Sequence, residues 1–510
     1  MFSSVLTMAL QGMDVCEVSV EADISEGGLP VFDMVGLLGS EVKESRERIR
    51  TSLRNSGYYL PPKRITVNLS PADMKKTGSH FDLPVAVSLM IAMGLIPPEC
   101  VEDTVIAGEL SLSGRMARVN GILPMVLKAR ERGYKRFILP SENAAEGGAV
   151  EGIEVIGVKS LDKAFRFLSG DESIEATRID LRKLLTGKRE AAFDLSSIRG
   201  QKTAKRGLEV AAAGMHNILM VGPPGGGKSM MAKCLPSILP ALTVEECLEI
   251  TGIHSVAGIL KSEGVVTERP FISPHHTVSR QALSGGGKIP KPGDVSLSHR
   301  GVLFLDELPE FDRNTLEILR QPLEDRKIHI SRASGKYTYP ADFLLAAAMN
   351  PCKCGYYPTG RCQCSKEEVK RYLSRISAPL LDRIDIFCQV DEVGFDELNG
   401  SGRMEESSEK IRERVSEAFE IQKERFKDRN IKFNSEMELK DIKEFCPLGS
   451  PEEALLKESF EALGLTARGY HRILRCARTI ADLEHSDRIT AVHLSEAIGY
   501  RSIDRGIWNV

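Results

Sequence analysis

The feature that most constrains the fold of this chain is the segment Gly222-Pro-Pro-Gly-Gly-Gly-Lys228-Ser229. Residues 217–221 before it form a short apolar run that is typical of a buried strand. Residues 230–235 after it can begin a helix. A strand, a Gly-rich turn that ends in Gly-Lys-Ser, and a helix together predict a phosphate-binding loop.

Each residue of such a loop has an expected role in nucleotide binding. Its glycines let backbone N–H groups point at phosphate oxygens, and the helix N-terminus adds a positive end. Lys228 is expected to reach the β- and γ-phosphates, and Ser229 to bind Mg²⁺. A Gly-rich turn that binds nothing is disfavoured because strand, Lys-Ser and helix occur together. ATP and Mg²⁺ are the expected cofactors, and the expected ATP-binding residues are Gly222, Pro223, Pro224, Gly225, Gly226, Gly227, Lys228 and Ser229.

Two later apolar runs end in polar residues that suit ATP hydrolysis. Residues 302–305 lead into Asp306 and Glu307, and residues 343–349 lead into Asn350. Asp306 suits the water shell of Mg²⁺, and Glu307 suits polarisation of the attacking water. Asn350 is expected to orient water beside the γ-phosphate. The alternatives are acids that merely cap a strand and a turn residue at a strand end.

Length and composition limit the class of protein. The 510 residues predict about three domains. Hydrophobic residues make up 42% and charged residues 27%, and no apolar run reaches the length of about 18 residues that a membrane span needs. The N-terminus lacks the basic start of a signal peptide. We therefore expect a cytoplasmic protein without a membrane partner. Because the net charge is −3, any nucleic-acid contact must be local.

Four of the eleven cysteines are clustered, at Cys352, Cys354, Cys362 and Cys364. Eleven cysteines without a secretion signal fit a reducing compartment. Four sulfurs in one Gly/Pro-containing loop are able to surround a tetrahedral Zn²⁺, although two Cys-x-Cys pairs are tighter than the usual Cys-x2-Cys. Free thiols and a redox pair are the alternatives. A catalytic zinc is disfavoured, because four thiolates leave no open position.

The pattern along the chain predicts four segments. Residues 1–169 alternate strand-like and helix-like pieces, and residues 170–193 are charged, aperiodic and interpreted as a linker. Residues 194–397 carry the phosphate-binding loop, a Pro/Gly-rich insertion before Asp306, a β-hairpin between residues 327 and 339, and the cysteine loop. Residues 398–510 are expected to be entirely helical.

Specific motifs occur on both sides of the predicted linker. The N-terminal half contains Gly28-Leu-Pro-Val-Phe, Gly78-Ser-His-Phe-Asp-Leu-Pro84 and Gly108-Glu-Leu-Ser-Leu-Ser-Gly-Arg115. The middle contains Pro274-His-His-Thr and Gly301-Val-Leu-Phe-Leu-Asp-Glu-Leu-Pro-Glu310. With these motifs the chain resembles the magnesium-chelatase-like AAA+ ATPases over nearly its whole length, and its layout is similar to the ComM/YifB branch.

The resemblance implies an α/β fold: a P-loop AAA+ core, a Lon-protease-like α+β N-terminal domain and an all-helical C-terminal lid. It also implies that Arg383 reaches the γ-phosphate of a neighbouring subunit, although an arginine flanked by acids also fits a surface ion pair. Arg468 best matches the sensor-2 position of the family. Arg472 and Arg475 remain alternatives, because they lie on a similar helical face.

A Lon-like peptidase would need a serine nucleophile and a lysine base. Alignment on Gly78 puts His80 or Phe81 at the serine position, and alignment on residues 120–122 puts Met125 at the lysine position. Ser79 and Lys128 lie nearby, so a shifted alignment stays open. We expect a scaffold without catalytic activity.

The resemblance to ComM implies a homo-hexameric ring that uses ATP to remodel DNA in branch migration, during recombination or natural transformation. The alternative is a chelatase-like motor that remodels a protein partner, and a third possibility is a Lon-like peptidase. The N-terminal domain is a possible site for a protein partner.

Basic side chains in two loops are the expected DNA ligands. Lys288 and Lys291 lie in the Gly/Pro-rich insertion, and Arg332 and Lys336 lie at the turn of the predicted hairpin. Six copies would line a channel with enough charge for phosphate binding, whereas one copy offers only a few charges. The alternative is that these are solvated loop residues. The neighbouring pair His275-His276 is expected to pack in its loop or against another subunit rather than to share a metal.

Overall fold

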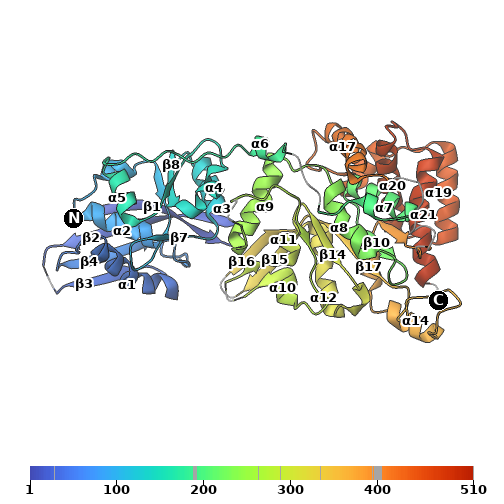
Figure 1. Ribbon diagram of the computed structural model, residues 1–510, viewed down its shortest axis with the longest axis horizontal. Helices are drawn as coiled ribbons and strands as arrows, with labels where there is room; N and C mark the ends of the chain where they lie inside the picture. Colours follow the sequence, from blue (N-terminus) through green and yellow to red (C-terminus); the bar gives the residue numbers. More distant parts are fainter. Residues whose placement is uncertain are drawn as a thin grey trace. The chain divides into compact units, whose positions relative to one another are not determined.

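The computed structural model describes residues 1–508 except 28, 188–191, 262–263, 288, 333–334, 393 and 395–404, and shows only the backbone of 502–508 (Figure 1). The chain forms two compact units. The first comprises Met1–Gly187, Thr243–Thr267 and Ser331–Tyr339, and the second comprises Lys188–Leu242, Glu268–Ile330 and Pro340–Val510. These units follow spatial contacts, and the division into four domains at 169, 193 and 397 stays a prediction.

The first unit is built on a seven-stranded mixed sheet with the order β3-β4-β2-β1-β5-β8-β9. The hairpin β1–β2 and the pair β2–β4 are antiparallel, and the remaining pairs are parallel. Alternating burial along β4 shows that one face of this strand covers the core. The strands are β1 (Phe2–Gln11), β2 (Asp14–Ser25), β3 (Val31–Val35), β4 (Arg64–Ser70), β5 (Thr104–Ile106), β8 (Arg136–Pro140) and β9 (Glu154–Val158), with a small separate pair β6 (Glu109–Leu110) and β7 (Met116–Ala117).

The central helix of the first unit is α2 (Asp82–Ala92), in which every residue is buried. It packs on β1, β2 and α1, which explains why its sequence is apolar on all sides. The other helices from the N-terminal part are α1 (Ser40–Asn55), α3 (Ile122–Glu131), α4 (Ala144–Gly148), α5 (Leu161–Leu168) and α6 (Leu181–Leu185).

One helix of the first unit comes from the middle of the sequence. Helix α9 (Val244–Ala257) starts with a capping box of Thr243 and Glu246, and packs against α3 and α6. Its Ser255 hydroxyl donates to the buried carboxylate of Glu146. The Leu123 backbone N–H also donates to this carboxylate, at 2.8 Å. Burial raises the pKa of Glu146, against the effect of these donors.

The predicted hairpin is confirmed as β15 (Lys327–Arg332) paired with β16 (Gly335–Pro340). Tyr337 on β16 lies against the β1–β2 turn. A Cβ added to Gly12 in that turn would be 3.2 Å from Tyr337 Cδ1, and Gly12 has a φ of +71°. A glycine suits this turn both because of its left-handed backbone and because of the close aromatic ring.

The second unit is built on a five-stranded parallel sheet with the order β11-β14-β17-β10-β18. Its strands are β10 (Ile218–Val221), β11 (Phe271–Ile272), β14 (Val302–Leu305), β17 (Leu344–Met349) and β18 (Ile386–Gln389). All residues of β10, β14 and β17 are buried, as the continuous apolar runs predict. The sequence placed Phe271 and Ile272 in an insertion, but they form the edge strand of this sheet.

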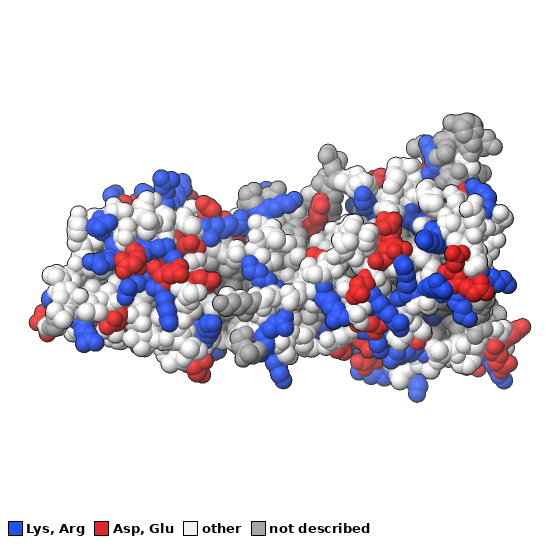
Figure 2. Space-filling model, turned by 90° about the horizontal axis from the view of Figure 1, so that it is seen from below, with Lys and Arg blue, Asp and Glu red and all other residues white. Residues whose placement is uncertain are grey.

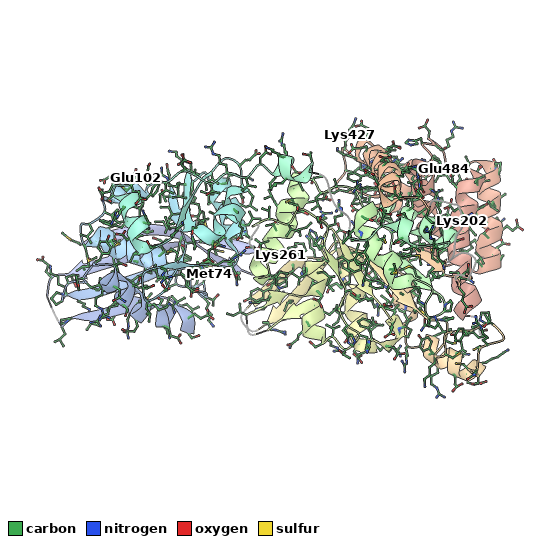
Figure 3. The ribbon with its side chains drawn as sticks, in the orientation of Figure 1. Met74, Glu102, Lys202, Lys261, Lys427 and Glu484 are labelled. Atoms are coloured by element: carbon green, nitrogen blue, oxygen red, sulfur yellow. The ribbon has the colours of Figure 1, made fainter. Side chains whose placement is uncertain are left out.

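Helices cover the sheet and extend to the C-terminus. In Figure 3, Lys202 marks the start of α7 (Lys202–Gly214), the helix that precedes β10. Helix α8 (Lys228–Ile238) follows β10. Short helices and strands connect the later strands: α10 (Arg280–Ser284), β12 (Gly285–Gly286), β13 (Lys291–Pro292), α11 (Asp294–Leu297), α12 (Arg313–Glu317), α13 (Pro322–Asp325), α14 (Lys366–Leu373) and α15 (Ala378–Leu381). The C-terminal helices are α17 (Ser408–Arg425), α18 (Leu439–Phe445), α19 (Ser450–Leu463), α20 (Ala467–Leu483) and α21 (Ala491–Trp508).

The C-terminal helices and the parallel sheet share one hydrophobic core. This core includes Met220 of β10, Leu208 of α7, Val415 of α17 and Ile480 of α20. The predicted helical end is therefore confirmed, and it is packed onto the ATP-site fold. None of the helices within the described ranges is long and apolar enough to cross a bilayer.

Candidate functional site

The phosphate-binding loop lies between β10, which ends at Val221, and α8, which begins at Lys228. Gly225 and Gly227 have φ angles of +80° and +85°, a region that favours glycine. A Cβ on Gly222 would lie 2.1 Å from the carbonyl oxygen of Val390. The loop therefore needs glycine both for its backbone conformation and for its close approach to the chain after β18.

Lys228 is the buried cation of this loop. Its Nζ donates to the carbonyl oxygens of Gly222 and Pro223, each at 2.7 Å, and to Oδ1 of Asn350 at 3.1 Å. Burial lowers the pKa of Lys228, and the carboxylate of Asp306 opposes this shift. The lysine and the asparagine that sequence analysis selected from separate segments thus meet side by side.

Ser229 and Asp306 form the second pair. The Ser229 hydroxyl donates to Oδ2 of Asp306 at 2.5 Å. Oδ1 of Asp306 accepts the backbone N–H of Glu307 at 2.9 Å, which fixes the carboxylate orientation. Hydroxyl and carboxylate oxygens are the ligands that Mg²⁺ prefers beside phosphates. The residues that would hold Mg²⁺ with ATP are therefore adjacent.

Glu307 lies at the tip of the β14 turn, with a φ of +51° and a side chain that is 61% exposed. Its Oε2 is 3.5 Å from Nδ1 of His276, whose ring lies against the His275 ring, tilted by 34°, at a centroid distance of 4.1 Å. The sequence analysis missed this contact. No sequence signal indicated it, because residues 271–272 read as part of an insertion, and only the structure shows that they form a strand of the parallel sheet.

The predicted arginines Arg383 and Arg468 meet at one carboxylate, that of Glu324. Nη2 of Arg383 is 2.5 Å from Oε1 of Glu324, and Nη1 donates to the carbonyl of Pro379 at 2.5 Å. Nη2 of Arg468 is 3.6 Å from the same oxygen, and its side chain is 60% exposed. The Arg383 side chain is only 5% exposed, so it has to leave an intramolecular ion pair before it reaches any phosphate.

The two alternatives to Arg468 have buried partners. Arg472 pairs with the buried carboxylate of Asp385, and Arg475 donates to the carbonyl of Met437. Burial opposes ionisation of Asp385, but Arg472 and His216 hold its pKa below the usual range. Arg472 and Arg475 thus have partners within the C-terminal part of the fold, Arg468 is the exposed member of the three, and the sensor-2 assignment stays a prediction.

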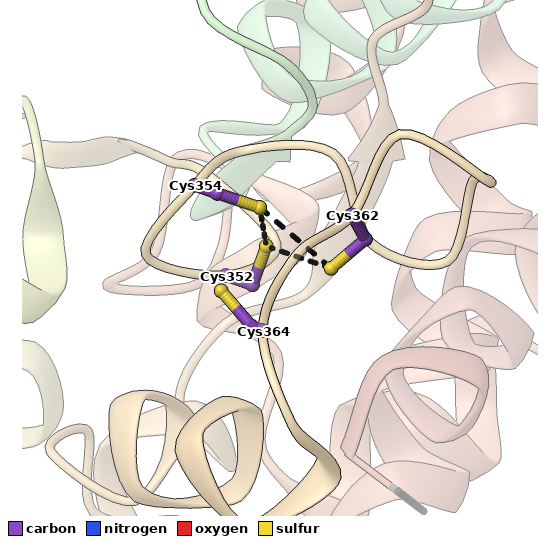
Figure 4. A group of neighbouring side chains, drawn as sticks. All are labelled: Cys352, Cys354, Cys362 and Cys364. Atoms are coloured by element: carbon purple, nitrogen blue, oxygen red, sulfur yellow. Dashed lines mark hydrogen bonds between the residues drawn. The ribbon is translucent and has the colours of Figure 1, made fainter.

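The four clustered cysteines meet in the loop between β17 and α14 (Figure 4). The Sγ–Sγ distances are 3.3 Å for Cys352–Cys354, 3.8 Å for Cys352–Cys362 and 3.6 Å for Cys354–Cys362. All four sulfurs lie within 4.8 Å of one another. Thiolates at about 2.3 Å from a tetrahedral zinc lie about 3.8 Å apart, so the set fits a metal of this kind.

The Lon-like residues are not arranged as a serine–lysine pair. The Ser79 hydroxyl donates to the carboxylate of Glu109, whereas Lys128 pairs with Glu131 at 3.0 Å. His80 is buried, with Nε2 3.0 Å from the Met8 carbonyl oxygen, and burial lowers its pKa to about 4. Met125, at the aligned lysine position, is fully buried.

The predicted DNA ligands that the structure describes are exposed. Lys291 lies on β13, and Arg332 and Lys336 lie at the facing ends of β15 and β16. Lys288 lies outside the described residues. On the face shown in Figure 2, Lys and Arg side chains are interspersed with Asp and Glu rather than gathered into one patch.

The parallel sheet order, the phosphate-binding loop and the carboxylates after β14 define an AAA+ ATPase. Residues 194–398 match magnesium chelatase, subunit ChlI; residues 20–143 match subunit ChlI of Mg-chelatase; and residues 405–501 match its C-terminal family. The chain belongs to the magnesium-chelatase-like AAA+ family, in the branch of ComM and YifB. This family indicates an ATPase that uses Mg²⁺, and its members are typically oligomeric.

Two relatives that match over nearly their full length, and one that matches over part of it, support this assignment. The uncharacterized protein YifB of Escherichia coli (strain K12) is 42% identical over 99% of this chain and 97% of its own length. The competence protein ComM of Haemophilus influenzae is 40% identical over 98% of this chain and 97% of its own. The magnesium-chelatase 38 kDa subunit of Chlorobaculum parvum is 27% identical over 31% of this chain and 54% of its own.

Nucleotide binding and hydrolysis should separate by mutation. Lys228→Ala removes a cation from the phosphate site and is expected to weaken nucleotide binding about tenfold or more. Glu307→Gln should leave affinity unchanged and lower turnover about 100-fold or more, because it removes the group that polarises water. Equilibrium binding of a fluorescent nucleotide and steady-state phosphate release measure the two effects.

The matched control is Glu310→Gln, because the Glu310 carboxylate lies in the same turn but pairs with Arg375 at 2.8 Å. It should retain both affinity and turnover. An equal loss of binding in Lys228→Ala and Glu307→Gln would contradict the assigned roles.

Proposed function

We propose that this chain is an ATP-driven AAA+ ring motor that remodels DNA, acting in branch migration during recombination or natural transformation. The observation that most supports this proposal is that the chain is 40% identical to the competence protein ComM over nearly the full length of both proteins. The contacts Lys228–Asn350 and Ser229–Asp306 supply the ATP site that such a motor needs.

The residues of the site divide the work of hydrolysis. Lys228 neutralises charge on the β- and γ-phosphates, and Ser229 and Asp306 hold Mg²⁺ and its water shell. Glu307 polarises the attacking water, and Asn350 orients water beside the γ-phosphate. Charge stabilisation by fixed groups in a partly buried site is the main source of acceleration.

We propose a homo-hexamer in which Arg383 completes the site of the neighbouring subunit. Arg383 and Arg468 gather around Glu324, and neither contacts Lys228, Ser229 or Asp306 through any hydrogen bond or ion pair found among the described residues. A phosphate from a neighbour would compete with the half-exposed Glu324 carboxylate for Arg383.

Complementation tests this arrangement. Arg383→Ala alone and Lys228→Ala alone should each lose ATPase activity, by about 10³-fold for the arginine. Mixed rings should regain activity, because a site built from the Lys228 of one subunit and the Arg383 of the other is complete. The control mixture, Lys228→Ala with Glu307→Gln, should stay inactive, because both groups belong to the same subunit's site. Inactive Arg383→Ala/Lys228→Ala mixed rings would contradict the trans role.

The proposed DNA grip consists of Lys288, Lys291, Arg332 and Lys336, repeated around the ring. DNA phosphates attract each of these cations without regard to sequence. Because basic and acidic side chains are interspersed on the face in Figure 2, firm binding requires several copies. Loop movement coupled to hydrolysis would then pull on the strand.

ATPase rates with single-stranded, duplex and branched DNA test this function. We expect stimulation, strongest with branched DNA, and a steep loss of DNA affinity with salt. The double variant Arg332→Ala/Lys336→Ala should weaken binding to all sequences and reduce the salt slope by about one per lost phosphate contact, with DNA-free ATPase unchanged. Lys327→Ala, at the far end of β15, is the matched control. An assembled double variant with wild-type DNA affinity and salt slope would exclude the hairpin as the grip.

The alternative function is a chelatase-like motor that remodels a protein partner, with the N-terminal part as the docking site. The match of residues 194–398 to magnesium chelatase favours it. An ATPase rate that DNA leaves unchanged and that a protein partner increases would favour this alternative. A peptidase finds no support, because the Ser79 hydroxyl bonds to Glu109 and Lys128 pairs with Glu131, so serine and lysine are not paired with each other.

We further propose that the four clustered cysteines hold one structural Zn²⁺. The sulfur spacing fits tetrahedral thiolate coordination. Since all four ligands come from the protein, the metal would have a structural rather than a catalytic task.

A further inference from the structure

The cysteine loop begins at the ATP site. Asn350, which accepts the Lys228 amine at 3.1 Å, is two residues from Cys352, whose side chain is fully buried. The backbone N–H of Gly222 also donates to the carbonyl of Met349, at 3.3 Å. The end of β17 therefore joins the phosphate-binding loop directly to the first cysteine.

The cysteine loop also packs against the phosphate-binding loop. A Cβ on Gly355 would lie 2.6 Å from Cδ of Pro224, and Gly355 has a φ of +89°. A cavity of about 290 Å³ is lined both by Gly222 and Pro223 of the phosphate-binding loop and by Tyr356 and Arg361 of the cysteine loop. The cysteine loop thus forms a wall beside the phosphate-binding loop.

Apart from the cysteines, this wall is held mainly by turns and by Arg361, which pairs with Glu392 and lies over the Tyr356 ring. Between Cys352 and Val369 no apolar side chain is buried, and the segment contains neither helix nor strand before α14 begins at Lys366. Its backbone is organised by isolated turns, such as Gly355 N–H to Cys352 O at 3.0 Å and Cys362 N–H to Thr359 O at 3.0 Å. A segment of this kind orders poorly unless a cross-link restrains it.

We propose that zinc bound by the four thiolates braces the phosphate-binding loop, so that nucleotide affinity depends on zinc occupancy. The zinc fixes the cysteine loop, and Gly355 transmits this order to Pro224. This inference rests on the proposed binding of ATP and of zinc. It adds that the affinity for one depends on whether the other is bound. Because coupling between two binding sites is reciprocal, bound nucleotide must strengthen zinc binding by the same factor.

The first experiment measures both directions of this coupling. Purified full-length protein is assayed for zinc by elemental analysis, with about one zinc expected per chain. A zinc-selective chelator then removes the metal, and ADP affinity is measured in excess Mg²⁺. We expect affinity to fall about tenfold and to return when zinc is added back. With ADP present, the zinc affinity, measured by equilibrium competition with the chelator, should rise by the same factor.

Two variants separate the brace from the metal. Gly355→Ala keeps all four thiols but places a methyl group against Pro224, so it should retain zinc and lose nucleotide affinity. Gly360→Ala is the matched control in the same loop, because its added Cβ has no atom within 4 Å, and it should behave as wild type. Cys364→Ser should lose zinc and affinity together, whereas Cys16→Ser, outside the cluster, should lose neither.

The outcomes are distinguishable. Zinc-loaded protein whose ADP affinity and zinc affinity show no mutual dependence would overturn the brace and leave the proposed ATPase standing. Protein that is free of metal yet binds nucleotide normally would overturn both the zinc and the brace. Zinc-loaded protein that binds no nucleotide at all would contradict the ATPase itself, and the brace with it.

Discussion

The parallel pairing of β10 and β14 with β17 brings three strand ends to one edge of the sheet. The residues that follow these strands are therefore neighbours, although up to 122 positions separate them in sequence: Lys228 meets Asn350, and Ser229 meets Asp306. All residues of β14 and β17 are buried, so both faces of these strands lie in the core. Phosphate binding depends on this packing as much as on the loop.

Charged side chains at the two ends of the parallel strands are held in different ways. Lys228 is buried among oxygen acceptors, whereas Glu307 is exposed and held near His276. Arg383 is buried but shares Glu324 with the exposed Arg468. An ion pair with a half-exposed carboxylate is weaker than a buried one, so a more highly charged phosphate is able to displace it.

The first unit shows that sequence order and spatial membership differ in this chain. Helix α9 follows the phosphate-binding helix in sequence, yet its Ser255 hydroxyl caps the buried Glu146 carboxylate of the first unit. The hairpin residues Ser331–Tyr339 also belong to that unit, with Tyr337 against Gly12. The polypeptide therefore passes repeatedly between the two units.

The sequence by itself determined the ATP site, because the phosphate-binding loop and its flanking strand and helix are local patterns, and the residues after Leu305 and Met349 follow recognisable buried strands. It also selected the hairpin and the cysteine cluster, which depend on short spacings. Tertiary structure decided the rest. Four features depend on contacts between distant segments. Arg383 and Arg468 share Glu324, and His276 faces Glu307. Phe271–Ile272 form an edge strand, and α9 joins the first unit. No local periodicity encodes such contacts, because they arise only when separate elements pack together.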